Sequence, residues 1–337
     1  MKDYTPAYPS SEEFTRMFRK AFDKYSGPSC ISVSPDSLPK PTDDVEKESK
    51  PTASEELMAL TGLDNIKEQI SREISYQRIM KMRHNAGYRT PVRLMHMLMT
   101  GPPGTGKTTT ARLIGSIYHQ EGILSKGHMI ETCRADLIGT HIGDTENNTR
   151  RRIDAARGGI LFIDEIYSLV DDPDDGRDFG QRVIDTLLPV MSDPSADIMV
   201  IGAGYKPDIK KMLKANSGLA SRFPLVVEFE NFSFEQLMDI AVKHLQKFGQ
   251  SFSMEAYDRF SVLVSQLSRT DNFGNARTVI TILENHCLPS MCQRLVAESH
   301  NSLFDIERTN IIEQDDIPAL QAVLPLLEEK GKRVGFI

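Results

Sequence analysis

Apolar and polar positions alternate with two different periods along this chain of 337 residues, and the period changes between regions. Short apolar runs of the kind that form strands occur at 94–99, 128–133, 160–163, 198–203 and 225–229. Between them, apolar residues recur with helical spacing at 66–82, 108–118 and 145–156. Strands that alternate with helices predict an α/β domain over 57–231, in which helices cover both faces of a parallel sheet.

The strand signal ends after residue 232, and only helical spacing follows. The apolar positions predict helices at 234–248, 254–268 and 276–296. We therefore expect a small all-helical domain over 232–301, followed by a C-terminal helical extension over 302–337. The chain contains no internal repeat.

Residues 1–56 predict an amphipathic helix followed by a flexible linker. The helix covers 10–25, where Ser10 and Glu13 have the spacing of a capping box and Gly27 lies beyond the end. Its apolar face consists of Phe14, Met17, Phe18, Ala21, Phe22 and Tyr25. Residues 32–56 are rich in proline, serine and charge, which is typical of a linker. The helix either docks on its own globular body or serves as a tethered contact for a partner.

Composition narrows the functional class. Lys plus Arg number 40 against 47 for Asp plus Glu, and a net charge of -7 disfavours general binding to a nucleic-acid backbone. The cysteines form no CxxC pair and no disulfide pattern, which indicates a reducing cytoplasm; they are Cys30, Cys133, Cys287 and Cys292. The chain starts without an apolar signal segment. No stretch approaches the ~20 apolar residues of a membrane span, so we expect no membrane association.

A phosphate-binding loop is the clearest chemical motif. The P-loop pattern is matched in full, between a predicted strand and a predicted helix, by Gly101, Pro102, Pro103, Gly104, Thr105, Gly106, Lys107 and Thr108. Glycines allow backbone N–H groups to close on phosphates, and the following helix adds its positive N-terminal end. Lys107 is expected to reach the β- and γ-phosphates of ATP, and Thr108 to ligate Mg²⁺. The adjacent Thr109 is included in the expected nucleotide-binding set.

A second motif places two acids at the end of a strand. The uninterrupted apolar run 160–163 is followed directly by Asp164 and Glu165. Such a run is typical of a strand buried on both faces, and packing alone gives no reason for it to end in two carboxylates. We expect Asp164 on the Mg²⁺ side of the nucleotide and Glu165 as the general base for the attacking water.

With these two motifs, four further segments resemble AAA+ ATPases of the CbbX / stage V sporulation protein K group, which includes the red-type Rubisco activase. The segments are 60–63, 203–205, 218–223 and 274–277, which read LTGL, AGY, GLASRF and GNAR. The resemblance spans about residues 57–299. It implies the AAA+ fold, with a P-loop parallel sheet flanked by helices and a small helical lid domain. It also implies a hexameric ring with ATP between the subunits.

The resemblance further implies roles for individual residues near the nucleotide. Arg222 resembles the arginine finger that reaches the γ-phosphate of the neighbouring subunit, and Arg277 resembles the sensor-2 arginine of the lid. Gly62 and Leu63 lie where the family packs the adenine. Residues 203–205 take the sensor-1 place, where the broader AAA+ pattern has a polar Asn or Thr.

A client-contacting pore loop is implied between the second strand and the following helix. It contains His141, Ile142 and Gly143, and the family prefers an aromatic residue at the position of His141. The resemblance thus favours a ring ATPase that uses ATP hydrolysis to remodel a protein client. A nucleotide-gated scaffold that recruits a partner through the N-terminal helix is the alternative. A nucleic-acid motor fits less well, because no basic, aromatic-rich segment accompanies the acidic composition.

Overall fold

A computed structural model describes residues 51–91, 94–139, 143–170, 179–298 and 306–325. The helix predicted over 10–25, most of the linker, and the pore-loop residues His141 and Ile142 lie outside the described residues. Among the described helices, none combines the length and the apolar character needed to cross a membrane.

A five-stranded parallel sheet forms the centre of the α/β domain, as the sequence predicts. Its spatial order is β2-β3-β4-β1-β5. The strands are β1 (Met97–Thr100), β2 (Met129–Thr132), β3 (Ile160–Ile163), β4 (Met199–Gly204) and β5 (Leu225–Glu228). Residues of β1, β3 and β4 are buried throughout, because helices cover both faces of the sheet.

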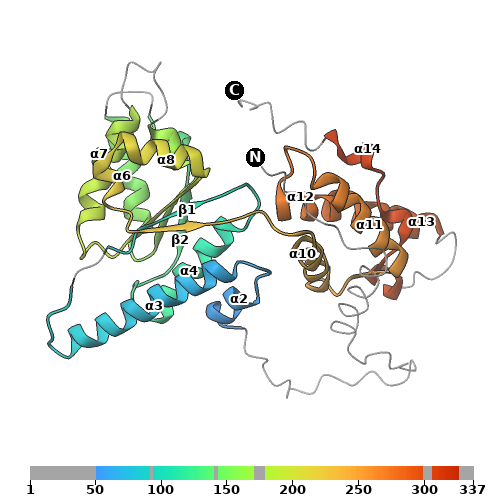
Figure 1. Ribbon diagram of the computed structural model, residues 1–337, viewed down its shortest axis with the longest axis horizontal. Coiled ribbons are helices and arrows are strands. Elements are labelled where there is room, and N and C mark those ends of the chain that lie inside the picture. Colours follow the sequence, from blue (N-terminus) through green and yellow to red (C-terminus); the bar gives the residue numbers. More distant parts are fainter. Residues whose placement is uncertain (1–50, 92–93, 140–142, 171–178, 299–305, 326–337) are drawn as a thin grey trace, which may run out of the picture. The chain divides into compact units, whose positions relative to one another are not determined.

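Side chains alternate between the two faces of the sheet and supply two separate cores. On one face, Leu98 and Val200 pack with α6 (Asp144–Ala156), α7 (Phe179–Ser192) and α8 (Lys206–Ala215). On the other, Met99 and Ile201 pack with α2 (Ala53–Ala59), α3 (Asp64–Asn85) and α4 (Lys107–Gln120). Figure 1 shows α6, α7 and α8 on one side of the sheet and α3 and α4 on the other. The α/β fold class predicted from the sequence is confirmed.

Helices also form the second domain, around a third core. They are α10 (Phe234–Gln246), α11 (Met254–Leu267), α12 (Asn275–Ile282) and α13 (Leu288–Glu298). A π-helical turn (Leu283–Cys287) joins α12 to α13, so the single helix predicted at 276–296 is continuous but irregular. Pro289 follows this turn and has no backbone N–H to donate, which disfavours regular α-helical bonding there.

The C-terminal segment differs from the helical extension expected over 302–337. Its described part contains short elements: two 3₁₀ turns (Ile306–Asn310 and Gln314–Asp316), β7 (Ile311–Ile312) and the four-residue α14 (Leu320–Val323). Strand β7 pairs in parallel with β6 (Ser251–Phe252). Buried Ile312, Ile317 and Val323 belong to the core of the helical domain. The boundary expected at residue 301 therefore does not coincide with the packing, because isolated apolar positions, not a helical period, anchor this segment.

Candidate nucleotide-binding site

The P-loop lies at the carboxyl edge of the sheet. Strand β1 ends at Thr100, and α4 begins at Lys107 with Gly106 as its N-terminal cap. The N–H of Gly101 donates to Gly204 O at 3.1 Å, which ties the loop to the end of β4. The hydroxyl of buried Thr105 donates to Pro102 O at 2.9 Å. The first N–H groups of α4 point along the helix axis and have no partner within the helix, so a phosphate is bound favourably there.

Lys107 brings the cationic side chain of the loop to the same place. Its Nζ donates to Gly101 O at 2.9 Å and to Pro102 O at 2.7 Å. Burial lowers the pKa of Lys107; the charge of Asp164 opposes this shift, and the charge of Arg277 adds to it. The amine therefore lies within electrostatic range of both the strand-end acid and the lid arginine.

Thr108 and Thr109 occupy the first turn of α4. Thr108 is half-buried, whereas Thr109 is exposed. The side chain of Thr108 is thus less accessible than that of Thr109.

Asp164 and Glu165 follow β3 but have different surroundings. The N–H of Asp164 donates to Thr132 O at 2.9 Å, which extends the pairing with β2, and its Oδ1 accepts from the N–H of Glu165 at 3.0 Å. Glu165 is exposed and adopts a left-handed conformation with φ of 47°. This conformation is uncommon for a residue other than glycine and is typical of functional sites.

Sequence reasoning missed Tyr167, which contacts Glu165. Tyr167 is buried, and burial raises its pKa, together with the negative charge of Glu165 and hydrogen bonding to that carboxylate. The ring of Tyr167 lies against Gly204, where an added Cβ would come within 2.7 Å of Tyr167 Cδ1. The centroids of the Tyr167 and Tyr205 rings are 6.4 Å apart. Gly204 thus leaves space for a ring that links the end of β4 to the acid. No sequence signal marks a tyrosine two residues after the acid as part of the site.

The beginning of α12 packs directly on the P-loop. Gly104 has φ of +69°, and a Cβ added there would lie 2.0 Å from Gly274 O and 2.9 Å from Arg277 Cβ. A glycine is needed at this position because both the conformation and the space exclude a side chain. Arg277 in the first turn of α12 is thereby placed beside the loop, as its implied contact with ATP requires.

Gly62 and Leu63 lie between the P-loop and the helical domain. Both adopt left-handed conformations, with φ of 63° and 62°. Leu63 Cδ1 would lie 3.9 Å from a Cβ at Gly106, so this apolar side chain borders the loop. The preceding residue Thr61 donates from its hydroxyl to Asp239 of α10 at 2.5 Å. This position beside the loop suits the adenine contact implied for Gly62 and Leu63.

Arg222 lies at the amino-terminal end of the parallel strands, opposite the end that carries the P-loop. It precedes β5, whereas the P-loop follows β1, and these two strands are parallel neighbours. Its Nε donates to Ser192 Oγ at 2.7 Å at the end of α7. A four-residue strand spans roughly 13 Å, so Arg222 is separated by about that distance from the P-loop of its own subunit. The structure groups Lys107, Asp164 and Arg277 but leaves Arg222 apart from them.

The residues expected to hold Mg²⁺ have suitable chemistry. This ion usually keeps several waters and takes one or two protein oxygens together with phosphate oxygens. Thr108 offers a hydroxyl, and Asp164 offers a half-buried carboxylate within electrostatic range of Lys107. Within the described residues, no group of three or more His, Cys, Asp or Glu side chains could hold a metal by itself. A metal held jointly with a nucleotide fits this pair of residues.

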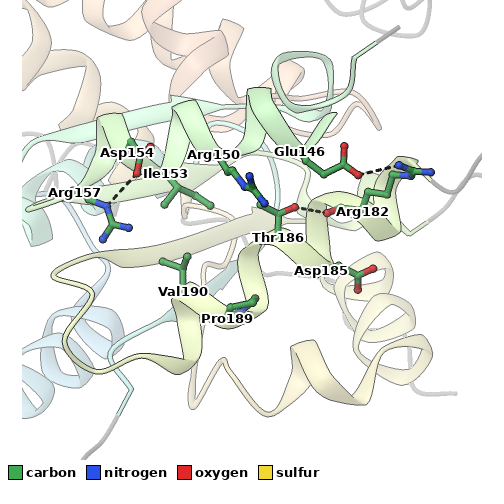
Figure 2. A pocket seen from close by; sticks show the side chains of 10 residues that line it. All are labelled: Glu146, Arg150, Ile153, Asp154, Arg157, Arg182, Asp185, Thr186, Pro189 and Val190. Carbon is green, nitrogen blue, oxygen red and sulfur yellow. Dashed lines mark hydrogen bonds and ion pairs between the residues drawn. The ribbon is translucent and has the colours of Figure 1, made fainter. Parts of the chain in front are cut away.

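A separate groove of about 450 Å³ runs between α6 and α7 (Figure 2). Arg182 pairs with Glu146 at 2.9 Å, and Arg157 pairs with Asp154 at 3.2 Å. The residues predicted to bind the nucleotide do not line it. It is lined by Glu146, Arg150, Ile153, Asp154, Arg157, Arg182, Asp185, Thr186, Pro189 and Val190. Its mixed charges, largely neutralised within the groove, distinguish it from the cationic P-loop.

Comparison with known proteins matches both domains. The family described as "ATPase family associated with various cellular activities (AAA)" matches residues 97–231, and an AAA lid domain matches residues 233–324. The lid match extends through α14, in agreement with the packing of the C-terminal segment.

Several curated proteins are similar in sequence. Stage V sporulation protein K of Bacillus subtilis (strain 168) is 36% identical over 248 residues, which cover 73% of this chain and 76% of that protein. The ESX-3 secretion system protein EccA3 of Mycobacterium leprae is 39% identical over 69% of this chain. The ESX-1 protein EccA1 of Mycobacterium tuberculosis H37Rv is 38% identical, also over 69% of this chain. The matches span only 37% and 42% of these two longer proteins.

Solved structures share the fold at low sequence identity. The AAA domain of FIGL-1 superposes with a TM-score of 0.53 at 19% identity, covering 83% of this chain and 89% of that domain. A mutant of Thermotoga maritima RuvB gives a TM-score of 0.52 at 20% identity, covering 80% of this chain and 71% of that one.

Proposed function

The chain belongs to the AAA family of ATPases, in the group of stage V sporulation protein K, and we propose that it binds and hydrolyses ATP at the carboxyl edge of its sheet. The observation that carries the proposal is the convergence of Lys107, Asp164 and Arg277. They come from three separate segments: Lys107 bonds to carbonyls of the loop, Arg277 packs against Gly104 of that loop, and Asp164 follows β3 at the same end of the sheet, so that both charges affect the amine of Lys107. Such a cluster between a helix N-terminus and a strand-end acid suits a nucleoside triphosphate.

Individual residues have separate roles in the proposed reaction. Lys107 exchanges its bonds to loop carbonyls for the β- and γ-phosphates, while the N–H groups of the loop and α4 surround the phosphate oxygens. Thr108 and Asp164 would hold Mg²⁺, which would neutralise charge on these phosphates. Glu165 orients the attacking water and accepts its proton. Tyr167 holds the carboxylate of Glu165 through its hydroxyl.

A ring oligomer completes the proposed site. Arg222 lies at the sheet edge opposite the P-loop, so it is poorly placed for the nucleotide of its own subunit. In a ring, it is offered to the γ-phosphate of the neighbour, where an arginine stabilises the charge of the transition state. We therefore propose a homo-hexamer with ATP between adjacent subunits.

A protein client is the proposed target of the motion that hydrolysis drives. Gly143 caps the start of α6 and ends the loop with His141 and Ile142, which we propose to contact the client. The relatives share the ATPase module, whereas their names place them in sporulation and in ESX secretion. The proposal therefore assigns remodelling of a protein, in a cytoplasmic setting, without an individual client.

Removal of the loop cation tests the proposed site. Lys107→Ala removes the side chain that would contact the β- and γ-phosphates, so calorimetry is expected to detect no ATP binding at low-micromolar concentration. Lys210→Ala is the matched control, because Lys210 is exposed on α8. The control is expected to bind ATP as the wild type does. Normal ATP binding by Lys107→Ala would show that this loop is not the site.

A further inference from the structure

Asn275 is a buried polar residue at the first position of α12. It is 1% exposed and has φ of 49°. Its Nδ2 donates to Pro103 O at 3.2 Å and to Asn231 Oδ1 at 3.0 Å, and its Oδ1 accepts from the N–H of Phe232 at 3.1 Å. Both amide N–H groups and the carbonyl oxygen thus have partners.

The partners of Asn275 belong to two different segments. Pro103 lies in the P-loop, whereas Asn231 and Phe232 lie in the segment that joins β5 to α10. One side chain therefore connects the phosphate loop, the connection between the two domains and the first turn of the lid helix. A buried amide with all its partners in place resists displacement, because each unpaired group would lose its hydrogen bond without gaining water.

Backbone conformation alone does not explain an asparagine here. A left-handed φ is accessible to glycine at no steric cost and is tolerated by asparagine. Glycine would satisfy the backbone, but it would supply none of the three hydrogen bonds. The asparagine is therefore required because its amide joins the P-loop to the segment that precedes α10.

We propose that Asn275 is a positioning residue that holds the start of the lid on the P-loop and so places Arg277 against the nucleotide. Arg277 lies in the same helical turn, and Gly274 O lies where a Cβ of Gly104 would clash. Loss of the amide frees this turn from Pro103, and Arg277 leaves the phosphates. The inference rests on the proposed ATP site and deepens it, because it makes lid position depend on the loop that contacts phosphate.

The test compares two substitutions to glycine at left-handed positions. Asn275→Gly retains the conformation and removes the amide, and we expect it to weaken ATP binding about tenfold, equivalent to ~1.4 kcal/mol. Asp197→Gly is the control, because Asp197 has φ of 45° and also loses side-chain bonds, to Ser125. It precedes β4, at the edge of the sheet away from the P-loop, and is expected to leave ATP affinity unchanged.

A double-mutant cycle separates positioning from general stability. In an Arg277→Ala background, Asn275→Gly should change ATP affinity by less than about twofold, because the residue it positions is already absent. An equal loss in both backgrounds would overturn the inference, and so would wild-type affinity of Asn275→Gly. If the glycine variant does not fold, Asn275→Asp keeps the acceptor for Phe232 and loses both donors, and the same cycle applies. Failure of the wild type to bind ATP would refute the proposed function instead.

Discussion

Contact between the lid and the P-loop can be broken by adding a single methyl group at Gly104. In Gly104→Ala the new Cβ would lie 2.0 Å from Gly274 O, so the two groups must separate by at least about 1 Å. The same change strains the backbone, because φ is +69°, at a cost of ~1–2 kcal/mol for alanine. The two effects have to be separated.

Gly249→Ala provides the matched control. Gly249 also has φ of +69°, but nothing lies within 4 Å of its added Cβ. Gly249→Ala should lose ~1–2 kcal/mol in the free energy of unfolding, measured by urea denaturation, and Gly104→Ala should lose at least as much. In Gly104→Ala the start of α12 is also displaced by ~1 Å, and a displacement of this size can reduce the rate of an enzyme ~10²-fold.

Two assays decide the outcome. The rate of ATP hydrolysis at saturating ATP should fall about 10²-fold in Gly104→Ala, and ATP affinity should fall with it, because Arg277 moves with the helix. Gly249→Ala should retain the rate and affinity of the wild type. If Gly104→Ala matched Gly249→Ala in both assays, the packing of α12 on the loop would be irrelevant to nucleotide binding.

Two further substitutions test residues of the proposed ATP site. Tyr167→Phe keeps the ring on Gly204 but removes the hydroxyl from Glu165, so kcat should fall about tenfold while ATP affinity stays unchanged. The control Tyr257→Phe in the lid should alter neither kcat nor affinity. An unchanged kcat in Tyr167→Phe would show that its hydroxyl does not position Glu165. Arg222→Ala should bind ATP normally but hydrolyse it ~10³-fold more slowly, and mixing with Lys107→Ala subunits, which retain Arg222, should restore part of the rate. Absence of recovery in confirmed mixed rings would contradict action between subunits.

The sheet and the chemical motifs could be predicted because their signals are local. Apolar runs such as 160–163 mark strands, and the carboxyl ends of parallel strands meet at one edge, which is where Lys107 and Asp164 lie. The position of Arg222 depends on strand order and on the edge it occupies, which periodicity does not determine. Its separation from the P-loop of its own subunit therefore emerges from the fold.

Contacts between distant segments could not be predicted from sequence patterns. Asn275 stands inside a recognisable GNAR segment, but its bonds to Pro103 and Asn231 join residues 172 and 44 positions away. Tyr167 depends on the left-handed turn at Glu165, which the apolar pattern does not signal. The C-terminal segment was expected to be helical, yet isolated residues such as Ile317 anchor it to the lid core.

Substitution of Glu165 by glutamine tests directly whether this residue is the general base for ATP hydrolysis. The amide keeps the size of the side chain but cannot accept a proton, and a positioned base supplies ~10²–10⁴ in rate. The measurement is single-turnover hydrolysis at saturating ATP alongside ATP affinity by calorimetry, with Glu255→Gln, exposed in the first turn of α11, as control. The role of Glu165 as the base predicts that Glu165→Gln binds ATP as tightly as the wild type but hydrolyses it at least ~10²-fold more slowly. Hydrolysis by Glu165→Gln at the rate of the wild type and of Glu255→Gln would contradict it.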